Sequence, residues 1–179
     1  MSPGLTTTAA EYEVVVLEGC DGTGKTTLAT TLATQHGYAL VHSGRTPDHV
    51  DLLARYRSIL AIPGRIVLDR SFISELVYGP LQYGRSRLTA SDAAQLALLV
   101  AARGGVLVHL TGRPETIVAR LRARDGSAPP LERISALTDA YRTVFAALAG
   151  TAPIITADTT AAALVGLGLA RAFGKNAIR

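Results

Sequence analysis

The chain has 179 residues, of which 48% are apolar and 18% charged, a composition typical of one compact globular domain and not of a disordered protein. The formal net charge of +4 comes almost wholly from arginine, and no basic block with interleaved aromatic residues is present, which argues against a nucleic-acid partner. A single cysteine, Cys20, excludes an internal disulfide and suits a reducing compartment.

Neither end of the sequence carries a membrane or export signal. Residues 1–10 are small and polar, without the basic and apolar regions of a signal peptide, so we expect a loose tail. Residues 161–173 are apolar but too few, and interrupted by Arg171, to span a bilayer. We therefore expect one cytoplasmic domain over residues 1–179, without a membrane partner, and the sequence is compatible with a homodimer.

The first strong pattern is an apolar, β-branched strand from Val14 to Leu17 that enters a glycine-rich turn and then a helix over residues 25–36. The turn fits G-x-x-x-x-G-K-[ST], with glycines that let the amide N–H groups point inward and a helix N-terminus that adds positive dipole. This predicts a cradle for the polyphosphate of ATP, with Lys25 on the β/γ-phosphates and the Thr26 hydroxyl on Mg²⁺. We assign to the cradle Gly19, Asp21, Gly22, Thr23, Gly24, Lys25, Thr26 and Thr27.

Short apolar strands alternate with helices along the rest of the chain. Further strands are expected at residues 38–42, 65–68, 106–110 and 153–156. Helices are expected at 48–60 with Asp48 as cap, at 74–78 before a looser segment at 79–87, from Thr89 or Ser91 to 103, and at 114–124, 131–149 and 159–173. This order predicts a three-layer, doubly wound α/β sandwich with a five-stranded parallel sheet, in which ligands bind at the carboxyl ends of the strands.

Two charged residues close the strand at 65–68. Asp69 stands where P-loop proteins place the acidic residue that holds Mg²⁺, usually through water, although an aspartate can also simply cap the next segment. Arg70 would project into the same crevice, where a guanidinium can bind a second phosphate with two parallel hydrogen bonds. The pair therefore predicts a metal site beside a second phosphate site.

At this point a family resemblance emerges. Residues 18–27, together with Asp69-Arg70-Ser71-Phe72-Ile73-Ser74-Glu75-Leu76-Val77-Tyr78-Gly79, resemble the thymidylate kinase family and its deoxynucleoside monophosphate kinase relatives. In that family the second motif reads Asp-Arg-Tyr, two residues, Ser, two residues, Ala-Tyr, and this chain keeps the spacing. Residues 112–115 with Arg120, Arg122 and Arg124 are similar to the family's Pro-Glu helix, which leads into an arginine-bearing lid, here at about residues 120–133.

The resemblance implies an ATP- and Mg²⁺-dependent kinase whose acceptor is a nucleoside 5′-monophosphate, with a pyrimidine deoxynucleotide such as dTMP favoured. It implies that Asp21 contacts the acceptor sugar hydroxyl and that Arg70 holds the acceptor phosphate. Ser74 and Tyr78 would shape the acceptor pocket, with Tyr78 against the sugar where a 2′-hydroxyl would crowd it. Arg45 would match an acceptor-phosphate arginine, but a plain solvated arginine is nearly as good an interpretation.

The chain also departs from the family pattern. Ser71 stands where the family usually has Tyr, and the segment that would carry the base-binding helix is short. Tyr56 or Phe72 could stack on the base, with a core position as the alternative for Phe72. Hydrogen bonds to the edge of the base could come from Arg55, Arg57 or Arg85, so the identity of the base stays open.

The catalytic arginine is sought by elimination. Some family members carry it in the phosphate loop directly after the aspartate, but here that position is Gly22. The charge must then come from the lid, and the candidates, in order, are Arg124, Arg122 and Arg133. For each of them the alternative is an ordinary exposed helix arginine.

Two other classes of protein remain to be weighed. A kinase acting on a hydroxyl, such as a deoxynucleoside kinase, favours a carboxylate placed to take the hydroxyl proton, and no glutamate follows the second strand, where such kinases keep one. A GTP-binding switch fits poorly, because the only asparagine is Asn176 and the guanine motif Asn-Lys-x-Asp is missing. The histidines show no metal-ligand spacing; His109 is expected in the core, and His42, at a strand end, near the acceptor.

Overall fold

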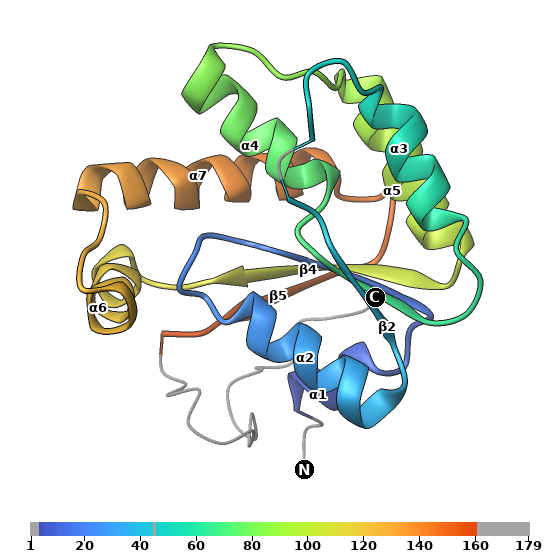
Figure 1. Ribbon diagram of the computed structural model, residues 1–179, viewed down its shortest axis with the longest axis horizontal. Coiled ribbons are helices and arrows are strands. Elements are labelled where there is room, and N and C mark those ends of the chain that lie inside the picture. The colour runs from blue at the N-terminus through green and yellow to red at the C-terminus, as the bar shows by residue number, and fades with distance from the viewer. Residues whose placement is uncertain (1–3, 45, 161–179) are drawn as a thin grey trace.

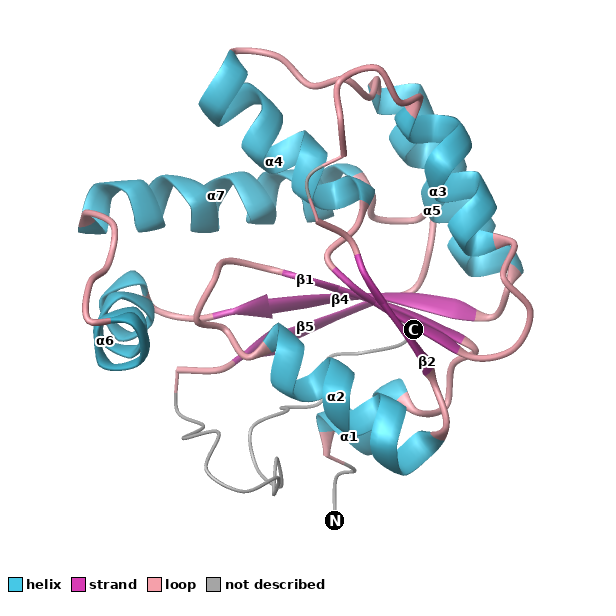
Figure 2. Cartoon of the chain, viewed as in Figure 1, coloured by secondary structure: helices cyan, strands magenta, loops and turns pink. Residues whose placement is uncertain are grey.

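A parallel sheet is the centre of the fold, and the computed structural model describes residues 4–44 and 46–160. The strands are β1 (Val14–Glu18), β2 (Ala39–His42), β3 (Ile66–Asp69), β4 (Gly105–Thr111) and β5 (Ile154–Asp158). They lie in the order β2-β3-β1-β4-β5, all parallel, with β1 in the middle. Figure 2 shows the strands in magenta among the helices. The predicted five-stranded, doubly wound α/β sheet is thereby confirmed for the described residues.

Helices cover both faces of the sheet, as Figure 1 shows. Val15 and Leu17 of β1 face an apolar cluster with α1 and α2, whereas Val14 and Val16 face a larger cluster with the other helices. This alternation follows from the two-residue period of a strand, and it explains why β1 is apolar on both sides. The helices are α1 (Leu5–Ala9), α2 (Lys25–His36), α3 (Leu52–Leu60), α4 (Phe72–Tyr83), α5 (Ala90–Ala102), α6 (Pro114–Asp125) and α7 (Leu131–Ala147).

The expectation of a loose N-terminal tail is wrong for residues 5–9. They form the short helix α1, in which Leu5 and Ala9, four residues apart and therefore on one face, are buried against the α2 side of the sheet. The Tyr38 hydroxyl donates to the backbone oxygen of Ala9 at 3.2 Å and fixes the end of the helix. The stretch is polar in composition, but its two apolar residues complete a core face.

Helix α4 is longer than its sequence predicts. It begins after Ser71, whose hydroxyl accepts from the Ile73 amide at 3.3 Å, and runs through Gly79-Pro80 to Tyr83, where Gly84 ends it. Proline in a helix removes one backbone hydrogen bond and normally disfavours continuation. Helix α4 packs along α7 and has buried residues as far as Gly79, whereas residues 80–83 are exposed. The extra turn ends where the Gly84 amide donates to the Pro80 oxygen at 3.0 Å.

Other boundaries differ by a few residues. Asp51, and not Asp48, caps α3 by accepting from the Ala54 amide at 3.0 Å. Thr89 caps α5, one of the two residues expected there. The helix expected over residues 159–173 falls almost entirely outside the described residues. Among the described helices, none combines the length and apolar character needed to cross a membrane.

Candidate active site

The phosphate-binding loop, residues 19–26, leaves the carboxyl end of β1 at the centre of the sheet. Gly19 has a φ of +145°, and a Cβ on it would lie 2.0 Å from the backbone oxygen of Leu110 in β4. Gly24, at a φ of +91°, leads directly into α2. Only glycine combines these angles with such a close approach, so the loop lies tightly against the sheet with the N-terminus of α2 above it.

Lys25 is folded back onto this loop. Its side chain is buried, and the ammonium donates to the backbone oxygens of Gly19 and Cys20, both at 2.8 Å. The Asp21 carboxylate lies 3.7 Å away. Burial lowers the pKa of Lys25, and the nearby charge of Arg70 lowers it further, while Asp21 opposes both. Lys25 therefore lies inside the cradle that the sequence assigns to it.

Thr26 and Asp69, the two predicted metal-holding residues, are in contact. The Thr26 hydroxyl donates to Oδ2 of Asp69 at 2.7 Å, across the gap between the start of α2 and the end of β3. Nδ1 of His42, at the end of β2, lies 3.3 Å from the same carboxylate oxygen. Three strand or helix ends thus bring oxygen and nitrogen groups together beside the loop.

Arg70 and Asp21 form an ion pair across the mouth of the site. Arg70 has a φ of +71°, a left-handed backbone that is rare for a residue other than glycine, and its amide donates to the Leu17 oxygen at 3.2 Å. This turn directs the side chain toward the phosphate loop. The guanidinium also lies 5.5 Å from the ring centroid of Tyr78, within the range of a cation–π contact.

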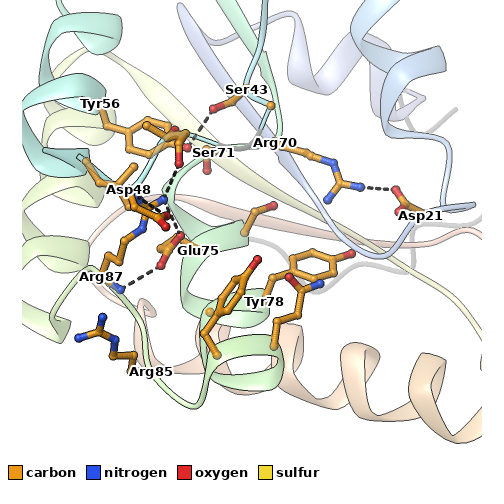
Figure 3. Close-up of a pocket in the computed structure, with 17 residues that line it drawn as sticks. Asp21, Ser43, Asp48, Tyr56, Arg70, Ser71, Glu75, Tyr78, Arg85 and Arg87 are labelled. Atoms are coloured by element: carbon orange, nitrogen blue, oxygen red, sulfur yellow. Dashed lines mark hydrogen bonds and ion pairs between the residues drawn. The ribbon is translucent and has the colours of Figure 1, made fainter. Parts of the chain in front are cut away.

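A cavity of about 470 Å³ extends from this ion pair between α3 and α4. Figure 3 shows Arg70 and Asp21 at one end of it, and Asp48, Glu75 and Arg87 at the other. Six of the residues predicted to bind the acceptor line it: Asp21, Tyr56, Arg70, Ser74, Tyr78 and Arg85. Arg45 lies outside the described residues.

Two of the candidates for base binding are corrected by the structure. Phe72 is fully buried, with its ring edge-on to Tyr56 at 6.0 Å between centroids, so it has no free face for a base and belongs to the core. Phe72 lies in the first turn of α4, and its ring packs against Tyr56 of α3. Arg57 is turned away from the cavity and donates to the Gln95 side chain at 2.7 Å. Arg55 does reach the cavity wall, where it donates to Ser43 and Thr46.

No protein-family model matches the sequence. Among curated proteins, the chain is similar to the thymidylate kinase of Xanthomonas campestris pv. campestris strain B100, with 35% identity over 167 residues that cover 75% of this chain and 71% of that protein. The enzyme of strain 8004 gives the same figures. The chain belongs to the thymidylate kinase family. The expectation drawn from residues 18–27 and 69–79 is therefore confirmed.

The fold is shared with solved structures of lower identity. The YorR protein of Bacillus subtilis, in complex with phosphorylated GDP, matches with a TM-score of 0.73 at 23% identity, over 82% of this chain and 85% of that one. A deoxyadenosine kinase from M. mycoides with bound dCTP matches with a TM-score of 0.53 at 15% identity, over 81% of this chain and 89% of that one. At these identities the likeness shows the fold alone. As a member of the thymidylate kinase family, the chain is a nucleotide kinase that uses a nucleotide as phosphate donor.

In this thymidylate kinase relative, the loop position held by Gly22 is crowded. Its φ is +82°, and a Cβ would lie 3.2 Å from Cγ of Leu121 and 3.4 Å from the backbone oxygen of Ile117. The loop is therefore packed directly against α6.

The lid arginines lie on both sides of the turn between α6 and α7. Arg122 and Arg124 are in the last turn of α6 and Arg133 is in the first turn of α7, all three exposed. Arg124 forms two hydrogen bonds of 2.7 Å to Asp125, which raise its pKa, and the Asp21 carboxylate raises it further. The charge of Arg124 is thus within electrostatic reach of the phosphate loop. Arg122, Arg124 and Arg133 are thus the three candidates that the lid offers.

The sequence interpretation missed the role of Glu18, the last residue of β1. Its side chain is completely buried and accepts hydrogen bonds from Ser71, Ser74 and Tyr141. Burial raises the pKa of Glu18, while the bonds from Ser74 and Ser71 oppose the rise. The available signal was a carboxylate at the end of an apolar strand, which needs a partner wherever it is buried.

Proposed function

We propose that the protein transfers the γ-phosphoryl group of ATP to the 5′-phosphate of a nucleoside monophosphate, with a pyrimidine deoxynucleotide such as dTMP as the favoured acceptor. The observation that carries this proposal is the Arg70–Asp21 pair, which stands at the end of the 470 Å³ cavity nearest the phosphate-binding loop. A guanidinium there faces the loop that holds the donor phosphates. The site is thus suited to two phosphate groups, one on each side of the transferred group.

The chemistry needs alignment and charge more than a base. An acceptor phosphate, with a second pKa of about 6, is already ionised near neutral pH, so no residue has to take a proton. Lys25 would exchange the backbone oxygens of Gly19 and Cys20 for donor phosphate oxygens, and Arg70 would exchange Asp21 for the acceptor phosphate. Asp21, once released, is placed to accept from the acceptor sugar hydroxyl.

The metal-holding residues fit Mg²⁺. The ion is usually held in kinases by one or two side-chain oxygens together with substrate phosphates and water, and the Thr26 hydroxyl and Asp69 carboxylate, 2.7 Å apart, supply such a pair. The described residues contain no cluster of three or more His, Cys, Asp or Glu side chains, as a dedicated protein cage would need. When bound, Mg²⁺ would neutralise phosphate charge, while Thr26 and Asp69 fix its position beside the loop.

A panel assay tests the proposal. ADP release is measured with ATP and Mg²⁺ against deoxy- and ribonucleoside monophosphates and the free nucleosides. The expected result is turnover with monophosphates, highest with dTMP or a related pyrimidine deoxynucleotide. Turnover with free nucleosides only would overturn it and favour a hydroxyl kinase. The acceptor site is tested by Arg70→Ala, which should lower kcat/KM for the acceptor by about 100-fold or more, as expected for losing a bidentate phosphate contact.

The setting of the reaction belongs to the same proposal. We assign it to nucleotide biosynthesis in the cytoplasm, because the one cysteine, Cys20, is an unpaired thiol buried in the phosphate loop and suits a reducing compartment. We propose no nucleic-acid partner for the protein. We expect a homodimer, which analytical sedimentation would test.

A further inference from the structure

Arg87, in the connection between α4 and α5, bonds to two other parts of the chain at once. Its guanidinium donates to the backbone oxygens of Thr46 and Pro47, both at 3.1 Å, in the connection between β2 and α3. It also donates to Glu75 of α4 at 3.3 Å and lies 3.7 Å from Asp48. One side chain thus joins α4 to a segment that lies about 40 residues before Arg87 in the chain.

Its partner Glu75 is held from a second direction. Oε1 of Glu75 accepts from the Arg87 backbone amide at 2.9 Å, so both carboxylate oxygens bind the same residue. The approach depends on Gly79, because a Cβ there would lie 2.8 Å from the backbone oxygen of Arg85 and 3.0 Å from Oε1 of Glu75. Residues 85–87 therefore lie directly on α4, and the backbone of Arg87 is held in place there.

The segment that Arg87 holds is also held from α3. Arg55 donates to the hydroxyls of Thr46 and Ser43 at 2.7 and 3.0 Å, and Ser43 is in turn bonded to the Tyr56 hydroxyl at 2.9 Å. Within this segment, Arg55 binds side-chain hydroxyls, whereas Arg87 binds backbone oxygens. The segment is thereby clamped between two helices, and the α4 side of the clamp depends on Arg87.

The clamped segment forms one wall of the cavity. Ser43, Gly44, Thr46 and Asp48 all line it, together with Glu75 and Arg87. Figure 3 shows Arg87 and Glu75 at the end remote from Arg70, so the clamp does not compete with the proposed phosphate contact. A wall that is ordered before the acceptor arrives spares the acceptor the entropy of ordering it, which raises affinity.

We propose that Arg87 is a positioning residue for the acceptor: through Glu75 and the backbone oxygens of Thr46 and Pro47 it closes the wall of the acceptor cavity between α3 and α4. The inference rests on the proposed function for the kind of ligand that enters the cavity. It places Arg87 outside the reacting groups. Its loss should therefore act on acceptor binding and leave donor binding and the chemical step in place.

The test compares Arg87→Ala and Arg87→Lys with Arg103→Ala. Arg103 is a matched control, because its guanidinium also donates to backbone oxygens of a loop, those of Leu60, Ile62 and Gly64. That loop leads into the amino end of β3, whereas the cavity lies beside Arg70, which follows the carboxyl end of that strand. With dTMP as acceptor, Arg87→Ala should raise the acceptor KM by about 10-fold or more, with kcat and the ATP KM within about three-fold.

Arg87→Lys should give an intermediate acceptor KM, because an ammonium keeps the charge near Glu75 but not the planar fork that bonds both backbone oxygens. Arg103→Ala should keep the wild-type constants. An acceptor KM within two-fold of wild type in a folded Arg87→Ala protein would overturn the proposal, as would an equal rise in the ATP KM.

Hydrogen–deuterium exchange separates this inference from the proposed function. In Arg87→Ala, the peptide that carries Thr46 to Asp48 should exchange faster than in wild type, and in Arg103→Ala it should not. Unchanged exchange would overturn the clamp whatever the substrate. A wild-type protein that turns over no nucleoside monophosphate, yet shows the faster exchange in Arg87→Ala, would instead refute the proposed function and keep the clamp.

Discussion

The carboxylate of Glu18 accepts hydrogen bonds from both the backbone amide and the hydroxyl of Ser71, at 2.5 and 2.9 Å. Glu18 closes β1 directly before the phosphate loop, and Ser71 begins α4, which lines the acceptor cavity. The amide and hydroxyl of Ser74 add bonds of 3.1 and 2.8 Å, and the Tyr141 hydroxyl of α7 adds one of 3.2 Å. One buried carboxylate therefore fixes the donor loop, the acceptor helix and α7 relative to one another.

Replacing Glu18 should cost more stability than its single charge suggests. Glu18→Ala leaves the buried Ser71 amide and the hydroxyls of Ser71 and Ser74 without this acceptor, while the Ser74 amide keeps its 3.1 Å bond to the Ser71 oxygen; each unsatisfied donor costs about 1–3 kcal/mol. We expect a loss of about 3 kcal/mol or more in the free energy of unfolding, measured by urea denaturation. Glu18→Gln retains one acceptor oxygen and should lose less. Glu11→Ala, at an exposed glutamate, is the control, and an equal loss in both alanine variants would contradict the role of Glu18.

Gly22 should tolerate no side chain, for two separable reasons. Its φ of +82° costs an alanine about 1–2 kcal/mol, and the Cβ would lie 3.2 Å from Cγ of Leu121. Gly150 has a φ of +85° with nothing within 4 Å of such a Cβ, so Gly150→Ala measures the backbone cost alone. Gly22→Ala should destabilise more than Gly150→Ala and should also raise the ATP KM. Equal unfolding midpoints and an unchanged ATP KM would show that α6 yields freely at this contact.

The fold followed from local patterns, and the misjudged segments depended on distant contacts. Apolar β-branched runs separated by helices are a strong signal, so each strand lies within two residues of its predicted bounds. Gly79-Pro80 is also a strong local signal, for a helix end, but α4 continues for one exposed turn, and residues 85 and 86 fold back onto Gly79. Leu5 and Ala9 could be assigned to the core only once α2 was in place to cover them.

In the candidate site, too, the residues set by local sequence could be predicted, and those set by distant contacts could not. The phosphate loop is contiguous in sequence, so its residues and the place of Lys25 within it could be predicted from spacing. Phe72 was ambiguous because the first turn of a helix can face a cavity or a core, and only the position of α3 decides between them. Arg87 gave no signal, because its partners Thr46 and Pro47 lie about 40 residues earlier and offer only backbone oxygens.

His109 should make the protein less stable in mild acid. It is buried in β4 and stacked on Phe145 at 4.4 Å between ring centroids, and burial, with a smaller effect of Arg142, lowers its pKa from 6.5 to about 4. Burial disfavours the charged imidazolium of His109 in the folded state. Between pH 6.5 and about 4, the His109 side chain therefore binds more protons in the unfolded state than in the folded state. The stabilising contribution is full above pH 6.5 and is lost as the pH falls toward 4, by about 3 kcal/mol at 1.4 kcal/mol per pKa unit.

Urea unfolding from pH 7.5 to 4.5 measures this contribution. The difference in unfolding free energy between wild type and His109→Gln should shrink or reverse as the pH falls, because the variant lacks the buried imidazole. Substitution of the exposed His49 by Gln serves as the control and should leave the pH slope of wild type unchanged. Parallel curves for wild type and His109→Gln would refute the assignment.

The lid should supply the catalytic charge from one of Arg124, Arg122 and Arg133, in that order of expectation. Arg124 leads because it lies in the last turn of α6, the helix that packs against the phosphate loop at Gly22. Alanine at the acting residue should lower kcat by about 10³-fold with little change in either KM, since an arginine finger contributes roughly 10³ to 10⁵ in rate.

Arg120→Ala is the control. It removes an arginine of the same helix that donates to the hydroxyl and the backbone oxygen of Thr159 at 3.1 Å and 2.5 Å, and it should keep kcat within about ten-fold of wild type. Steady-state kinetics with saturating ATP and dTMP decide the matter: if all three lid variants stay within ten-fold of wild type, the prediction fails, and the charge that stabilises the transferred phosphoryl group comes from Lys25, Arg70 and Mg²⁺ without the lid.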